Sequence, residues 1–405
     1  MNELQEDGYS GQKNRRAVVS VVYRYVPAYR APFYEALRVE LAAVGVELRL
    51  IYGQPTGRDV SRGDAATIGW GTRIRNRVLR IGSKDVIWQP ALPHLRGSDL
   101  IIVEQASRLL LNYVLSFGRR CGLVKRIAYW GHGRNFQQDS ASALAEWIKR
   151  RASVRADWWF AYNAASVDIV KSLGFPPERI TDVQNAIDDS SLRASLEGVT
   201  PSRLDEFRRR FGIEGRNICV FIGSLYPDKR LGYLLDAAEI IRSHVGDFEL
   251  LVVGAGPDEG VLRAFATERP WVHELGFQDS EVRACALRAS RLMLIPGAVG
   301  LAVIDSFVSE CPLVTVAGRA HGPEYGYLAD GVNGISLSED STALDYAEIV
   351  IGLLGDDAAL ERLREGCSSR AGSLTLEQMV NRFAGGIMSA LQAGSRPAQG
   401  GPEPR

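Results

Sequence analysis

Short apolar stretches alternate with longer amphipathic ones along most of the 405-residue chain. Ala17–Tyr23, Val46–Tyr52 and residues 100–103 are apolar and rich in β-branched side chains, which is typical of buried strands. Residues 219–223 form a similar run. Apolar side chains then recur at steps of three and four, which predicts an amphipathic helix against a sheet. Strands alternating with helices favour βαβ units and a parallel sheet, so the predicted fold class is α/β.

The length suggests more than one domain. At about 150 residues per domain, 405 residues correspond to two or three domains. A polar, charged stretch follows residue 200 and places the boundary there. Both chain ends are polar or rich in Gly and Pro, which favours disorder. The predicted organisation is a disordered tail at 1–16, a first domain at 17–200, a second domain at 201–375, a helix at 376–393 and a disordered tail at 394–405.

Glycines mark almost every strand-to-helix crossing after residue 217. In parallel sheets, ligands bind at the carboxyl ends of strands, where Gly lets the backbone approach a phosphate. Gly223 and Gly254 each follow an apolar run, and Lys229 and Arg230 stand at a helix start. The helix dipole disfavours cations at that end, so their presence indicates an anionic ligand. We therefore predict a nucleotide site in the second half.

Four motifs in this half are GSLYPDKRL, VVGAGPDEGVL, PGAVGLAVIDSF and EYGYLADGVNG. Together they resemble the nucleotide-sugar half of the retaining family 4 glycosyltransferases (glycosyl transferases group 1) of GT-B fold. The resemblance implies two Rossmann-like domains facing a central cleft and a UDP- or GDP-sugar donor. It implies metal-independent transfer with retention, without a cofactor, to a glycan, a glycolipid or a small-molecule acceptor held by the first domain. It also implies that the last helix returns to that domain.

The resemblance assigns roles to individual residues. Lys229 matches the lysine that contacts the diphosphate. Gly300, Leu301 and Ala302 keep the loop that leads into a helix and can face phosphate. Asp305 stands at the acidic position that contacts the ribose, and a carboxylate can accept two hydroxyl hydrogen bonds there.

Two positions depart from the family pattern. Gly297 replaces the Glu that touches the transferred sugar, and Ser224 replaces an Arg, whose charge Arg230 could supply. These departures leave the sugar open. They also keep two alternatives: a nucleotide-sugar epimerase, which the missing carboxylate argues against, and a non-catalytic nucleotide-sugar-binding scaffold. A dehydrogenase is disfavoured because the spacing in GAGPDEG does not fit GxGxxG.

The first half has one strong candidate. A strand runs directly into Gly131-His132-Gly133, and the two glycines free the backbone to place the imidazole at the strand end. A single His is usually structural, but this setting favours function, and the resemblance implies that His132 faces the transferred sugar. The loop after the first strand is either an acceptor surface or a packed domain edge. The predicted catalytic residues are His132 and Lys229; the donor-binding residues are Gly223, Ser224, Lys229, Arg230, Gly254, Gly256, Gly300, Leu301, Ala302 and Asp305; and the acceptor-binding residues are Tyr25, Tyr29 and Arg30.

Charge and cysteine content narrow the partners. Lys plus Arg and Asp plus Glu number 48 each, so we expect no nucleic-acid partner. The stretch WIKRRASVRADWWF at 147–160 mixes basic and Trp residues; it is either a peripheral membrane surface or a solvated helix followed by a buried strand. No run approaches the about 20 apolar residues of a membrane span, and no signal peptide is evident. Five scattered cysteines indicate neither disulfides nor a metal site, so we expect a cytoplasmic protein.

Overall fold

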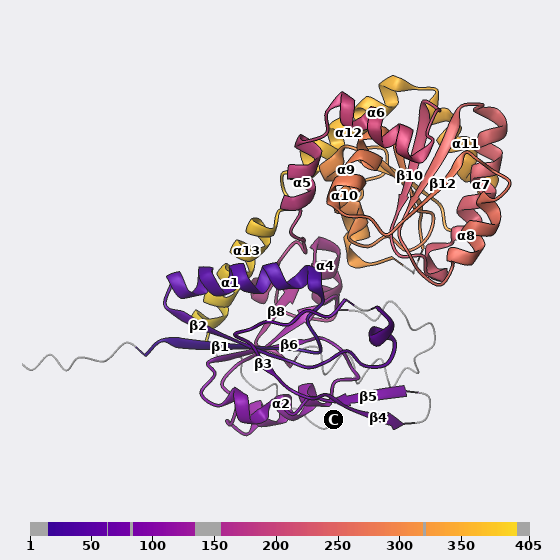
Figure 1. The fold of residues 1–405 in the computed structure, drawn as a ribbon. Helices are drawn as coiled ribbons and strands as arrows, with labels where there is room; N and C mark the ends of the chain where they lie inside the picture. Colours follow the sequence, from indigo (N-terminus) through magenta and orange to yellow (C-terminus); the bar gives the residue numbers. More distant parts are fainter. Residues whose placement is uncertain (1–14, 63, 82–83, 134–154, 319–320, 395–405) are drawn as a thin grey trace, which may run out of the picture.

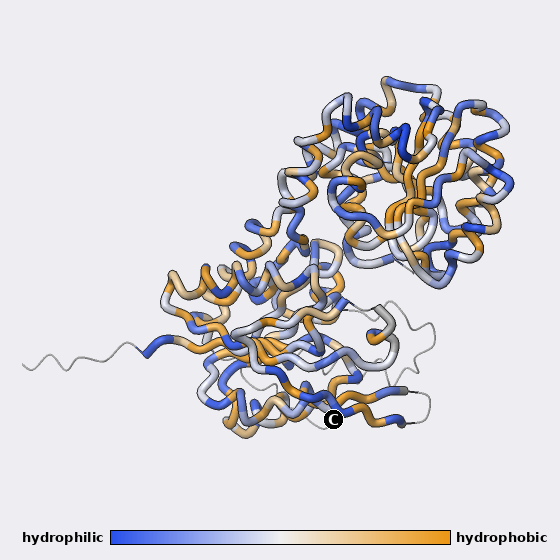
Figure 2. Tube along the Cα trace, viewed as in Figure 1, coloured by the Kyte–Doolittle hydropathy of each residue, from blue (hydrophilic) through white to orange (hydrophobic). Residues whose placement is uncertain are grey.

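The computed structural model describes residues 15–62, 64–81, 84–133, 155–318 and 321–394. In these residues the chain forms two α/β lobes, each built on a parallel sheet (Figure 1). The predicted fold class is confirmed, and both sheets are apolar along their strands (Figure 2). Of the predicted disordered tails, residues 1–14 and 395–405 lie outside the described part.

The first lobe contains a seven-stranded parallel sheet in the order β3-β2-β1-β6-β7-β8-β9. Alternate side chains of its strands enter two separate cores: Val21 faces the core under α1 and α13, and Val22 faces the core under α2. The elements of this lobe are β1 (Ala17–Tyr23), α1 (Ala31–Ala43), β2 (Val46–Tyr52), β3 (Thr72–Arg73), β6 (Leu100–Glu104), α2 (Leu110–Arg120), β7 (Ile127–Gly131), β8 (Trp158–Ala161), α4 (Ala164–Ser172) and β9 (Ile180–Asp182), with the hairpin β4 (Arg77–Ile81) and β5 (Lys84–Trp88).

The second lobe contains a six-stranded parallel sheet in the order β12-β11-β10-β13-β14-β15. Its elements are α5 (Ser190–Glu197), α6 (Pro201–Phe211), β10 (Asn217–Ile222), α7 (Leu231–His244), β11 (Phe248–Val253), α8 (Glu259–Ala266), β12 (Val272–Gly276), α9 (Ser280–Ala289), β13 (Leu292–Leu294), α10 (Ala302–Ser309), β14 (Leu313–Val316), β15 (Gly334–Leu337), α11 (Ala343–Leu354) and α12 (Asp357–Ala371). Short 3-10 helices η1 (Ala28–Arg30), η2 (Gly57–Arg62), η3 (Leu92–Leu95), η4 (Pro177–Arg179), η5 (Pro227–Lys229) and η6 (Pro323–Tyr327) lie in the connections.

Two observations bear on the predicted boundaries. Helix α5 packs against α9 and α10, so the second lobe begins before residue 200. Helix α13 (Leu376–Gln392) returns to the first lobe and lies against α1 (Figure 1). The ring of Phe383 on α13 lies 4.2 Å from that of Phe160, 4.9 Å from that of Trp130 and 5.2 Å from that of Phe33.

Each sheet has one switch point, where the strand order reverses its direction of growth: between β1 and β6, and between β10 and β13. The segments that follow two such strands run to opposite faces of the sheet. Ligands of open α/β sheets bind outside these points, at the carboxyl ends of the strands. In the second lobe, the segments that begin at Gly223 and at Ile295 flank the switch point.

Two of the three tryptophans in the candidate membrane surface at 147–160 are buried and cannot contact a membrane. Trp158 and Trp159 lie on β8 with 6% and 0% exposure, because β8 is an inner strand of the sheet. Residues 147–154, with Trp147, lie outside the described residues. Among the described helices, none is long and apolar enough to cross a membrane.

The aromatic contact of α13 predicts a stability effect. Phe383→Ala removes a fully buried ring and leaves a cavity between α13 and the first sheet. The free energy of unfolding of the first lobe should fall by about 3–5 kcal/mol, measured by denaturant unfolding with tryptophan fluorescence. Ser389→Ala, at an exposed position of the same helix, is the control and should change stability by less than about 0.5 kcal/mol. Equal unfolding midpoints for the two variants would contradict the packing described.

Candidate functional site

The ends of β10 and β11 touch through their backbones. A Cβ on Gly254, whose φ is +147°, would lie 1.9 Å from the carbonyl oxygen of Gly223, so only glycine fits. The backbone N–H of Gly254 donates to the carbonyl of Gly276 at 2.8 Å, and that of Gly256 donates to the Glu259 carboxylate at 2.8 Å. Both N–H groups are therefore already bonded within the protein, and the turn serves to bring two strand ends together.

Lys229 lies between the segments that flank the switch point. Its ammonium group donates to the carbonyl of Ala298, and the N–H of Ala298 donates to the carbonyl of Asp228 at 2.8 Å. Burial lowers the pKa of Lys229, while the Asp228 charge acts in the opposite direction. Within the described part of the chain, no carboxylate forms a salt bridge with this ammonium group. A largely desolvated cation without an acidic partner is suited to an anionic ligand.

The same contact explains Gly297. A Cβ there would lie 2.3 Å from the carbonyl oxygen of Asp228 and 2.4 Å from the carbonyl carbon of Lys229. The turn that carries Lys229 therefore occupies the space that a side chain at position 297 would need. At Gly300, three residues later, an added Cβ meets nothing within 4 Å.

Helix α10 starts beside this loop. Gly300, Leu301 and Ala302 are half-buried and lead into its first turn. The N–H groups of Val303 and Ile304 in that turn donate to the carbonyls of Gly300 and Leu301 at 3.2 and 2.9 Å. Asp305 lies in that turn and is ion-paired at 2.5 Å with Arg283 of α9. Burial raises the pKa of Asp305, and Arg283 opposes the shift. The carboxylate still has acceptor capacity beyond this pair.

His321 supports the same loop from its other side. The N–H of Val299 donates to His321 Nδ1 at 3.0 Å, so Nδ1 is unprotonated, and Nε2 donates to the carbonyl of Val316 at 2.7 Å. Burial lowers the pKa of His321, and its ring stacks on Tyr325 at 4.1 Å. A neutral, doubly bonded imidazole therefore fixes the loop after β13.

In the first lobe, His132 follows β7 at the carboxyl edge of the sheet. Its ring stacks on Tyr162 with centroids 4.3 Å apart and planes 25° apart. Burial lowers the pKa of His132 to about 4, so the imidazole is neutral at physiological pH.

Contacts from η6 join the two lobes. The side-chain amide of Asn163 donates to the carbonyl of Pro323. The Tyr327 hydroxyl bonds to the carbonyls of Asn185 and Tyr162 at 3.0 and 3.3 Å. Because Tyr162 stacks on His132, the second lobe is connected to the strand end that carries the histidine.

A buried polar chain crosses the same junction. Arg30 donates to the Asn185 Oδ1 at 2.7 Å, and Asn185 donates from Nδ2 to Glu324 Oε1 at 2.5 Å. Burial raises the pKa of Glu324, and Asn185 and Arg30 oppose the shift. The predicted acceptor surface is therefore wrong for two of its residues, since Arg30 and Tyr25 are 1% and 2% exposed.

The remaining predicted residues lie at the surface. Tyr29 is 41% exposed. Ser224 is exposed, and the exposed Arg230 lies over the ring of Tyr233, 4.2 Å from its centroid. The structure thus brings Lys229 together with the loop before α10, while Arg230 stacks on α7.

Sequence analysis did not assign His321, Glu324, Asn185 or Arg283 to the site. The run His-Gly-Pro-Glu, which begins five residues after the end of β14, could have indicated the first two. Asn185 and Arg283 carry no local pattern, because their partners come from distant segments. Among the residues described, no group of three or more His, Cys, Asp or Glu side chains could hold a metal ion.

Comparison with known proteins gives matches in sequence and in fold. Residues 216–356, which lie in the second lobe, match the family model described as Glycosyl transferases group 1. HepE of Anabaena, solved in complex with UDP, is similar in structure, with a TM-score of 0.67 and 14% identity over 92% of this chain and 100% of that chain. WaaG, a glycosyltransferase involved in lipopolysaccharide biosynthesis, gives a TM-score of 0.61 and 16% identity over 91% and 98%. These likenesses show the GT-B fold.

Two curated relatives are similar in sequence. The alpha-D-kanosaminyltransferase of Streptomyces kanamyceticus is 24% identical over 232 residues, 56% of this chain and 58% of that protein. The GDP-mannose-dependent alpha-(1-6)-phosphatidylinositol monomannoside mannosyltransferase of Mycolicibacterium smegmatis is 27% identical over 215 residues, 49% and 53%. The chain thus spans little more than half the length of these relatives.

The contact at position 297 yields a prediction with a matched control. Gly297→Ala forces the Lys229 turn to move, whereas Gly246→Ala, between α7 and β11 and outside the proposed site, places its methyl group in open space. UDP or GDP, measured by titration calorimetry, should bind at least about tenfold more weakly to Gly297→Ala, a loss of about 1.4 kcal/mol. Gly246→Ala should retain binding within about threefold. Equal affinities in the two variants would show that the turn does not shape the site.

The lowered pKa of the largely desolvated His132 imidazole predicts a pH effect on stability. The folded protein holds the ring neutral down to about pH 4, whereas the unfolded chain takes up a proton near pH 6.5. This contribution to stability is complete above pH 6.5 and is lost as pH falls toward 4, by about 1.4 kcal/mol per pH unit. His132→Gln should flatten the stability curve in that window and match the wild-type slope above it. An unchanged slope between pH 6.5 and 4, measured by chemical unfolding, would show that the ring is not buried.

Proposed function

We propose that the protein is a retaining, metal-independent GT-B glycosyltransferase that uses a UDP- or GDP-linked sugar. The observation that carries this proposal is the half-buried ammonium of Lys229, which forms no salt bridge among the described residues and lies at the switch point of the second sheet. A departing nucleoside diphosphate needs a preorganised positive environment when no metal supplies one. Lys229 and the N–H groups of residues 300–302, at the start of α10, offer that environment together.

The ribose of the nucleotide donor would be held by Asp305 of α10. Asp305 lies one turn into α10, and its pairing with Arg283 orients the carboxylate. A carboxylate that keeps acceptor capacity can receive hydroxyl hydrogen bonds from a ribose.

The transferred sugar would face the first lobe. His132 is neutral, so it can stabilise an oxocarbenium-like sugar through a hydrogen bond without adding positive charge beside it. Its stacking on Tyr162 fixes the ring plane. Because Gly297 has no side chain, the usual carboxylate contact to the sugar is absent, and the donor sugar is left open.

The acceptor belongs to the first lobe in this proposal. The relatives are named for different molecules. One is the phosphatidylinositol monomannoside mannosyltransferase described above, and another, 24% identical over 242 residues, is the 2-deoxystreptamine glucosyltransferase of Streptomyces kanamyceticus. We therefore keep a glycan, a lipid-linked acceptor and a small molecule as the acceptor classes.

The proposed location is the cytoplasm, with peripheral contact at the inner face of the plasma membrane.

Removal of the cation tests the donor site. Lys229→Ala should lower turnover of the nucleotide sugar by about 10²–10³, by analogy with loss of one oxyanion donor. Lys171→Ala, at a half-exposed lysine of α4, is the control and should keep wild-type turnover. Hydrolysis or transfer would be followed as nucleoside diphosphate release, with and without excess chelator, which should have no effect. Normal turnover in Lys229→Ala would refute the role of Lys229 in stabilising the diphosphate. If the wild-type protein binds the nucleotide sugar but does not turn it over, the non-catalytic nucleotide-sugar-binding scaffold is favoured.

A pair of variants separates chemistry from binding. His132→Ala should lower turnover and leave UDP or GDP affinity nearly unchanged, because its contact is to the transferred sugar. Asp305→Asn should weaken binding of the free nucleoside diphosphate. The measurements are steady-state kinetics and calorimetric titration on both variants. If His132→Ala weakens binding of the nucleotide without its sugar, the histidine belongs to the nucleotide site or to the core.

A further inference from the structure

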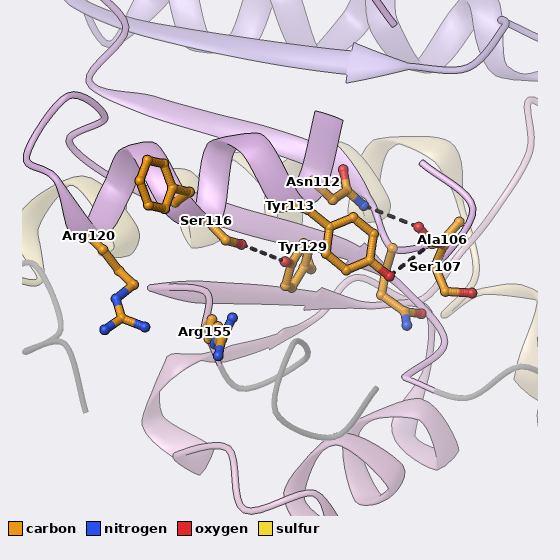
Figure 3. A pocket seen from close by; sticks show the side chains of 10 residues that line it. Ala106, Ser107, Asn112, Tyr113, Ser116, Arg120, Tyr129 and Arg155 are labelled. Carbon is orange, nitrogen blue, oxygen red and sulfur yellow. Dashed lines mark hydrogen bonds between the residues drawn. The ribbon is translucent and has the colours of Figure 1, made fainter. Parts of the chain in front are cut away.

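A pocket of about 170 Å³ lies beside α2, on the face of the first sheet opposite α1 and α13 (Figures 1 and 3). Tyr113, Phe117 and Arg120 of α2 line it, together with Tyr129 of β7 and Arg155, which precedes β8. The roles proposed above for the donor and the transferred sugar use none of these side chains.

Several polar groups of the lining are already bonded within the protein. The amide of Asn112 donates to a backbone carbonyl at 2.9 Å, and the Tyr113 hydroxyl donates to another at 3.1 Å. The hydroxyls of Ser116 and Tyr129 lie 3.4 Å apart (Figure 3). A ligand rich in hydroxyl groups would compete with these bonds. Ring surface remains available, since Phe117 is 68% exposed and Tyr113 is 42% exposed, and it favours an apolar or aromatic group.

The charge of the pocket is positive. Arg120 and Arg155 are exposed, and no carboxylate of the described residues forms an ion pair with either guanidinium group. The neighbouring Arg119 differs, because it pairs with Asp157 at 2.9 Å. In Figure 3 the side chains of Arg120 and Arg155 extend to the same side of the pocket. Two guanidinium groups that have no acidic partner in the described part of the chain are suited to a phosphate or a carboxylate.

The size and place of the pocket limit its ligand. A cavity of about 150 Å³ can hold benzene, whereas drug-sized ligands occupy about 300–1,000 Å³. The pocket is therefore sized for a single ring.

The pocket also lies close to His132. Gln105 lines the pocket, and a Cβ built on Gly131 would lie 2.7 Å from the Cβ of Gln105. Since Gly131 directly precedes His132, the pocket adjoins the strand end that carries the histidine.

We propose that this pocket is an acceptor subsite that binds an aromatic or other apolar ring bearing an anionic group. The ring packs against Phe117 and Tyr113, and the anion pairs with Arg120 and Arg155. The rest of the acceptor extends past Gln105 toward His132. The assignment as an acceptor subsite rests on the proposed glycosyl transfer, whereas ligand binding by the pocket can be measured without turnover.

The test uses phenyl phosphate as the probe, titrated calorimetrically into the full chain with saturating UDP, so that the diphosphate site is filled. Phenyl phosphate should bind at least about tenfold more tightly than inorganic phosphate or phenol. The double variant Arg120→Ala, Arg155→Ala should lose at least about tenfold in affinity. Arg73→Ala, an exposed arginine of β3 outside the pocket, should bind as the wild type does.

A second pair isolates the ring contact. Phe117→Ser should weaken binding of phenyl phosphate but not that of inorganic phosphate. Val114→Ser, exposed on the same helix outside the pocket lining, should change neither. The proposal is overturned if phenyl phosphate binds no better than inorganic phosphate, or if the arginine variant binds as the wild type does. Phenyl phosphate would also be titrated without UDP, which reports on the pocket alone. If UDP does not bind, or a nucleotide sugar is not turned over, the result counts against glycosyl transfer and not against ligand binding by the pocket.

Discussion

The contact between the Lys229 turn and Gly297 is the constraint on which the site depends. Two loops from neighbouring strands meet there with no space for a side chain, and the N–H of Ala298 closes the contact on the carbonyl of Asp228. Lys229 is thereby held with its ammonium on a backbone carbonyl and away from much of the solvent. Burying a cation without a carboxylate is unfavourable in the empty protein, and an anionic ligand offsets that cost when it binds. Under the proposed function, this backbone geometry favours binding of a diphosphate beside Lys229.

The same loop is connected to the other lobe. Neutral His321 holds the N–H of Val299, and η6 begins two residues later. From η6, Tyr327 and Glu324 bond to the strand ends of the first lobe through Asn185. The segment from His321 to Tyr327 thus contacts both the loop of residues 297–302 and the lobe that carries His132. If the loop of residues 297–302 moves, we expect the junction between the lobes to move as well. The reason is that His321 and η6 pack against both, and close-packed contacts transmit displacement.

Much of the fold follows from local pattern, and less of the site does. The strands β1 and β2 were predictable because continuous apolar, β-branched runs are typical of inner strands, and the glycines that follow β10 and β11 marked the ligand edge. Arg30 was not predictable as a buried residue. Its guanidinium lies 5.3 Å from the Trp130 ring and bonds to Asn185, which is 155 residues away in the chain. A charged residue next to prolines and tyrosines has the local pattern of a surface loop, and only long-range contacts reverse that expectation.

The most direct test of the central claim is a crystal structure of the protein with bound UDP. We predict that the diphosphate lies within hydrogen-bond distance of Lys229 Nζ and of the backbone N–H groups of residues 300–302, with the ribose hydroxyls at Asp305. The Ala298 carbonyl should then share the ammonium group with the phosphate oxygens. A nucleotide bound in the first lobe, or a diphosphate directed away from Lys229 and α10, would contradict the account.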